Sequence, residues 1–161
     1  GADVTLINAG VSGDTTAGGL SRVDWTLTPD VDGMIVALGG NDLLRGLDPA
    51  VSRANIDGIL SAAQKADVEV LLVGMTAPGN YGPEYKSAFD AIYPELAAQY
   101  DTELLGSFFE GLSVDGVLPE LSQAQQYFQP DGVHPNAEGV AKIVGAMGPK
   151  VLDLIADIKA Q

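Results

Sequence analysis

The single histidine of the chain, His134, lies three residues after Asp131 in the segment FQPDGVHPNAEG. A carboxylate that holds one imidazole nitrogen leaves the other nitrogen free to take a proton from a nucleophile, so this pair could form an oriented general base. Gly132 and Pro135 favour a tight turn that would fix the pair. A lone loop histidine is more often a surface residue or a satisfied core residue. The pair by itself leaves both interpretations open.

Two further residues could supply hydrogen-bond donors to a developing oxyanion. Gly13, in NAGVSGDTT, offers a backbone N–H, and Asn41, in LGGNDLLRG, offers a side-chain amide. Each is also compatible with an ordinary turn or helix cap. The neighbouring Asp14 and Asp42 are interpreted as capping or turn residues.

Ser12 lies in GVSGD, which is close to a nucleophile-elbow pattern. The pattern G-x-S-x-G requires a glycine two residues after the serine, and Asp14 occupies that position. Ser12 is therefore a poor candidate for a nucleophile.

The 161 residues are 46% hydrophobic and 19% charged, which suits one folded domain. The net charge of -14 disfavours binding to nucleic acid or to anionic membrane surfaces. The absence of cysteine excludes thiolate nucleophiles and cysteine-bound zinc. No apolar run approaches the roughly 20 residues of a membrane span.

Apolar segments that read as strands alternate with segments that read as helices. The strand-like runs lack polar alternation, which is typical of a parallel sheet covered on both faces, so we expect a three-layer α/β/α sandwich. In such sheets, ligands bind at the carboxyl ends of the strands. Asp48 and Asn136 are expected N-caps, and Pro94 should interrupt a helix. The expected strands are 3–10, 32–40, 68–75 and 102–106, and the expected helices are 14–27, 48–66, 83–100 and 136–160.

The blocks NAGVSGDTT, GGND and DGVHPN, in this order, resemble those of the SGNH hydrolases, also called GDSL esterases. APGNYGPEYKSAFDAIYPELA resembles a segment of the bacterial arylesterase, acyl-thioesterase and lysophospholipase branch. The resemblance covers essentially the whole chain. It implies a flavodoxin-like sheet of order 2-1-3-4-5 and hydrolysis of short acyl or aryl esters or thioesters through an acyl-serine intermediate. It implies no metal and no cofactor, and it favours a periplasmic or secreted location.

The resemblance also assigns residue roles. It makes Asp131 and His134 the acid and base of a catalytic triad, and Gly13 and Asn41 oxyanion-hole donors. Apolar side chains after the second expected strand would line the substrate site: Leu43, Leu44 and Leu47.

The sequence departs from the family because the first block, a strand ending in Gly-Asp-Ser-Leu, has no counterpart here. We therefore expect 1–161 to be a single, N-terminally incomplete hydrolase domain. Strand 1 and the nucleophilic serine would lie on an upstream segment of the same protein, which would be a partner alongside the small-molecule substrate.

Two other functions stay open at this point. One is a non-catalytic acyl- or carbohydrate-binding relic of the same scaffold, although such a relic would have no need to keep all four site residues. The other is a flavodoxin-like nucleotide binder that uses SGDTTAGG as a phosphate loop, but this loop lacks the lysine of a P-loop.

Overall fold

The computed structural model describes residues 3–113 and 124–160 and contains a parallel sheet of three strands. The strand order is β1-β2-β3, with Met34 beside Val70 and Leu72 beside Leu104. The strands are β1 (Gly33–Val36), β2 (Glu69–Val73) and β3 (Glu103–Leu105). The α-helices are α1 (Thr16–Thr26), α2 (Gly40–Leu44), α3 (Pro49–Lys65), α4 (Pro83–Asp90), α5 (Ile92–Tyr100) and α7 (Ala137–Ala160). Short 3-10 helices occupy Gly79–Tyr81, Glu110–Leu112 and Gln125–Tyr127.

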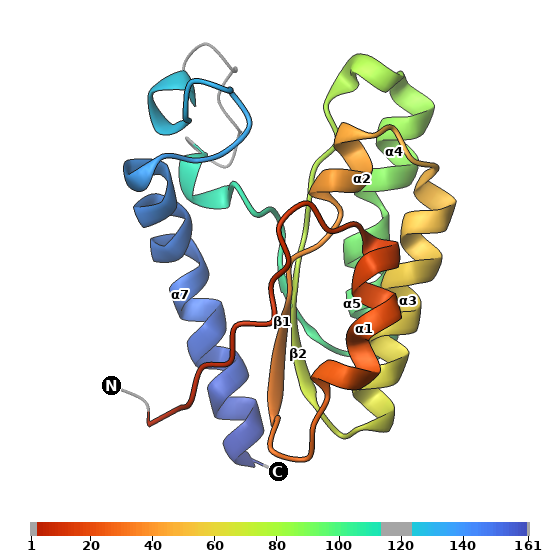
Figure 1. Cartoon of the computed structure of the whole chain (residues 1–161), viewed down its shortest axis with the longest axis vertical. Helices are drawn as coiled ribbons and strands as arrows, with labels where there is room; N and C mark the ends of the chain where they lie inside the picture. Colours follow the sequence, from red (N-terminus) through yellow and green to blue (C-terminus); the bar gives the residue numbers. More distant parts are fainter. Residues whose placement is uncertain (1–2, 114–123, 161) are drawn as a thin grey trace.

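Successive residues of β2 point to opposite faces of the sheet, and both faces are apolar. Val70 and Leu72 belong to a core shared with α3, α4 and α5, whereas Leu71 and Val73 pack with Leu154 of α7. Figure 1 shows α7 on one side of the strands and α1, α3 and α5 on the other. Burying a leucine of this kind contributes about 1.5–3 kcal/mol, so the central strand anchors both layers of helices.

The helix boundaries follow local signals in the sequence. The Asp48 side chain accepts a hydrogen bond from Ala50 N at 2.9 Å, and Pro49 opens α3, as expected. The Asn136 side chain accepts from the N–H groups of Glu138 and Gly139, both at 3.0 Å, which confirms it as the N-cap of α7. The expected helix 83–100 divides at Ala91, shortly before Pro94, because proline has no N–H to continue the helical ladder.

The expectation of a strand at 3–10 is wrong for this structure. Residues 3–10 have no regular secondary structure, and Leu6 is 87% exposed while Val4 and Ile7 are more than half exposed. The apolar pattern is typical of a buried strand, but a strand also needs a neighbour to pair its N–H and C=O groups. No strand of the described residues pairs with 3–10, and β1 is an edge strand of the sheet. The strands that are present have the order expected for positions 3-4-5.

Candidate functional site

Asp131 and His134 lie together in the turn that precedes α7. His134 Nδ1 is 2.8 Å from Asp131 Oδ2, and Asp131 Oδ1 accepts hydrogen bonds from the N–H groups of Val133 at 2.9 Å and His134 at 3.0 Å. Gly132 has a φ of +68°, which a glycine adopts without strain, and its N–H donates to Gln129 O. One carboxylate thus organises both the turn and the imidazole ring.

These hydrogen bonds lower the pKa of Asp131 to about 2, with the backbone N–H groups of His134 and Val133 as the largest causes and the His134 ring next. The carboxylate is therefore charged at neutral pH and holds the His134 Nδ1 proton. Within the described residues, His134 Nε2 has no hydrogen-bond partner, and the side chain is 69% exposed. The ring is oriented, and its second nitrogen is available to a partner.

Gly13 occupies a turn between the N-terminal segment and α1. Asp14 N donates to Val11 O at 3.2 Å, and Gly13 has a φ of +76°, as the third residue of a type II turn requires. Within the described residues, no acceptor pairs with the Gly13 N–H. This N–H is a free donor on a hydrogen-bonded turn.

Asn41 lies on α2, beside the turn that contains Gly13. Its Nδ2 donates to Asp14 O at 2.9 Å, and Arg45 Nη2 donates to Gly13 O at 2.9 Å. An amide nitrogen carries two hydrogens, so Asn41 retains a second donor. The structure therefore places Asn41 beside the turn that contains Gly13, and their shared role as oxyanion donors stays a prediction.

Asp42 is a capping residue, one of the two roles expected from the sequence, but the N–H that it caps belongs to the start of α1 and not to its own helix. Its carboxylate is fully buried, accepting from Thr16 N at 2.9 Å, from Thr16 Oγ1 at 2.6 Å and from Ser52 Oγ at 3.0 Å. Asp14 instead forms an ion pair with Arg22 at 2.8 Å, while its backbone belongs to the turn. No local pattern distinguishes the two aspartates, because the burial of Asp42 depends on three helices meeting.

The three leucines expected to line the substrate site have different environments. Leu43 packs in the main core and is 9% exposed, so it does not face a substrate. Leu44 is 59% exposed, and Leu47 is half-buried. The sequence missed Tyr85, whose hydroxyl donates to Leu47 O at 2.9 Å and so joins α4 to this loop.

The Asp131–His134 pair and the Gly13–Asn41 pair are not joined to one another by any hydrogen bond or ion pair of the described residues. Ser12 is exposed, and no hydroxyl in this part of the chain hydrogen-bonds to His134. The turn before α1, helix α2 and segment 125–136 nevertheless lie toward the same end of the molecule (Figure 1). Within residues 3–113 and 124–160, no hydroxyl is therefore bonded to His134, and the two pairs are separate candidates for parts of one site.

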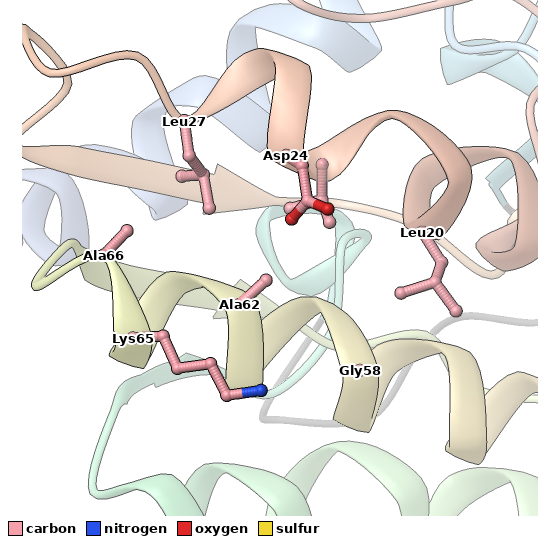
Figure 2. A pocket seen from close by; sticks show the side chains of 8 residues that line it. Leu20, Asp24, Leu27, Gly58, Ala62, Lys65 and Ala66 are labelled. Carbon is pink, nitrogen blue, oxygen red and sulfur yellow. The ribbon is translucent and has the colours of Figure 1, made fainter.

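An open groove elsewhere on the surface lies between α1 and α3 (Figure 2). Leu20 and Ala62 line it together with Asp24 and Lys65, and none of the residues considered above belongs to it. The described residues contain no cluster of histidine and carboxylate side chains that could hold a metal ion. Among the described helices, none has the length and apolar character needed to cross a bilayer.

A sheet of parallel strands with an aspartate-oriented histidine and two candidate oxyanion donors at one end defines the class of SGNH-type hydrolases. The GDSL-like lipase/acylhydrolase family matches residues 1–142, and the chain belongs to this family. It is 38% identical over 156 residues to esterase TesA of Pseudomonas aeruginosa, covering 96% of this chain and 73% of that protein. It is 36% identical over 152 residues to thioesterase 1/protease 1/lysophospholipase L1 of Escherichia coli, covering 94% and 69%. The crystal structure of AlinE4, an SGNH-hydrolase family esterase, superposes with a TM-score of 0.71 at 45% identity, covering 94% and 77%.

Proposed function

We propose that the protein is a carboxylic ester hydrolase that cleaves short acyl or aryl esters or thioesters through an acyl-serine intermediate. The 2.8 Å contact between His134 Nδ1 and Asp131 Oδ2 carries this proposal, because it leaves Nε2 as a proton acceptor. Membership of a family whose relatives are named esterase and thioesterase supports it.

In this mechanism, a serine Oγ attacks the acyl carbon while its proton passes to His134 Nε2. The Gly13 N–H and the free N–H of Asn41 stabilise the oxyanion that forms. His134 then gives the proton to the departing alkoxide or thiolate. A water molecule, deprotonated by His134, attacks the acyl-serine, and the proton returns to the serine as the acid leaves.

We further propose that the serine lies on an upstream segment of the same protein, which adds a strand to the sheet beside β1. β1 is an edge strand, and the exposed apolar side chains of 3–10 find no neighbour. No hydroxyl of the described residues is bonded to His134. One added strand that ends in a serine would account for both observations.

The test compares hydrolysis of p-nitrophenyl butyrate by the protein with its natural N-terminal sequence and by residues 1–161 alone. We expect activity in the former, with a loss on the order of 10³-fold or more in His134→Ala. Val133→Ala, in the same turn, serves as the matched control and should stay near wild type. Near-normal turnover in His134→Ala would contradict the assignment of the base.

A fluorophosphonate that labels activated serines locates the nucleophile by peptide mapping. We expect the label on a residue upstream of Gly1. Labelling of Ser12 together with activity in 1–161 alone would refute the proposed segment. Ligand binding without any turnover or labelling would favour a non-catalytic binding protein.

A further inference from the structure

The buried carboxylate of Asp42 connects the starts of three helices, and one of them, α1, follows the turn that bears Gly13. Thr16 is the first residue of α1, Asp42 lies on α2, and Ser52 lies on α3. Asn55 of α3 adds a hydrogen bond from Nδ2 to Thr16 Oγ1 at 3.0 Å. Within residues 3–113 and 124–160, Asp42 is the only buried residue of an ionisable acidic or basic type.

A gain in the free energy of unfolding does not explain why the Asp42 carboxylate is buried. Moving such a group out of water costs free energy, and apolar residues of similar volume often stabilise a core equally well or better. The carboxylate instead orients one helix relative to another. Its Oδ2 accepts the backbone N–H of Thr16, and the start of α1 fixes the position of that N–H. Asp42 thereby sets the position of α2 relative to the first turn of α1.

Both candidate oxyanion donors lie next to this junction. Asn41 precedes Asp42 on α2, and its Nδ2 donates to Asp14 O, two residues before Thr16. Gly13 precedes Asp14, and its carbonyl accepts from Arg45, one residue after α2 ends. A shift of α2 relative to α1 would therefore displace the Asn41 amide and the Gly13 N–H relative to one another.

We propose that Asp42 is a positioning residue. It keeps the Gly13 N–H and the Asn41 side-chain amide at a fixed position relative to one another, so that both can donate to one oxyanion. The proposal rests on the proposed function for its effect on turnover, but the positioning itself is a separate claim. A displacement of about 1 Å in such a site can cost about 10²-fold in rate.

The kinetic test uses the protein with its natural N-terminal sequence. Asp42→Ala should lower kcat by about 10²-fold with KM changed less than about threefold, since the donors act on the transition state. Asp42→Asn should recover most of this loss, because its amide oxygen can still accept the Thr16 N–H while the hydroxyls of Thr16 and Ser52 turn to accept from its NH₂. Ile59→Ala, a core truncation in α3, is the control for lost stability. Equal losses of kcat in Asp42→Ala and Ile59→Ala at matched thermal stability would overturn the proposal.

A double-mutant cycle with Asn41→Ala distinguishes an effect of Asp42 on the position of Asn41 from a nonspecific loss of structural order. If Asp42 acts through Asn41, Asp42→Ala should cost several-fold less in the Asn41→Ala background than in wild type. The same cost in both backgrounds would refute the proposal. Thr16→Val, which removes the hydrogen bond from Thr16 Oγ1 to the Asp42 carboxylate, completes the cycle if Asp42→Ala does not fold.

An NMR measurement decides the positioning claim without reference to hydrolysis. In a ¹⁵N correlation spectrum, Asp42→Ala should shift the Gly13 amide signal, whereas Asp42→Asn, which keeps an acceptor for the Thr16 N–H, should leave it near its wild-type position. Gln64→Ala, an exposed change on α3, should leave the Gly13 signal unmoved. An unmoved Gly13 signal in Asp42→Ala would overturn the positioning role. A wild-type protein that hydrolyses no ester would overturn the proposed function alone, and these spectra would still test Asp42.

Discussion

The Asp131→Asn substitution separates the role of the carboxylate charge from its role in the turn. Asp131 Oδ1 accepts two backbone N–H groups, and an asparagine oxygen at the same place can accept both. The new NH₂ group would then face His134 Nδ1, where Oδ2 lies at 2.8 Å. A donor at that position makes Nδ1 the acceptor and puts the ring proton on Nε2. The base is thus lost while the turn persists.

The expected loss in kcat is on the order of 10³-fold. A buried triad can lose about 10⁴-fold on such a change. Here the side chains of His134 and Asp131 are 69% and 47% exposed, so water can compete for Nδ1 and allow part of the ring population to adopt the productive tautomer. The loss in kcat should therefore be smaller than the loss in a buried triad.

The assay is turnover of a p-nitrophenyl ester together with thermal unfolding of the same samples. Asp131→Asn should keep a melting temperature near that of wild type, whereas Asp131→Ala should lose both activity and the hydrogen bonds of the turn. A loss of less than tenfold in Asp131→Asn with an intact fold would refute the argument that this carboxylate sets the tautomer.

Three other measurements test the structure. The Asp131 carboxyl should titrate with a midpoint near its pKa of about 2 in ¹³C NMR, so its contribution to stability is present above about pH 4 and is lost as the pH falls toward 2; a midpoint above 3.5 would contradict the turn geometry. Leu43→Ala should lower the free energy of unfolding by about 2–5 kcal/mol, whereas Leu44→Ala should leave it within about 0.5 kcal/mol and change KM for longer acyl chains. Denaturant unfolding and ester kinetics measure both effects, and a larger loss of stability in Leu44→Ala than in Leu43→Ala would contradict the assigned faces of α2. Asp48→Ala should cost about 1 kcal/mol through loss of the cap of α3, and an unchanged denaturation midpoint would argue against the cap.

The features that the sequence predicted well depend on neighbours in the chain. The caps at Asp48 and Asn136, and the pairing of Asp131 with His134 across three residues, involve hydrogen bonds that span only a few residues. The motifs around Gly13 and Asn41 indicated a shared edge of the sheet because parallel strands end on one side. The resemblance to known blocks then predicted roles for these residues that spacing alone left open.

The features that only the tertiary structure decided depend on which surfaces meet. Asp42 and Asp14 have similar local contexts, yet Asp42 is buried among α1, α2 and α3 and Asp14 pairs with Arg22. Leu43 and Leu44 are adjacent, and the packing of α2 against the core buries the first and exposes the second. Segment 3–10 has the composition of a strand, but pairing requires a neighbour, and composition cannot supply one. Short stretches of sequence determine local hydrogen bonds, whereas burial and strand pairing depend on two segments that meet in the folded structure.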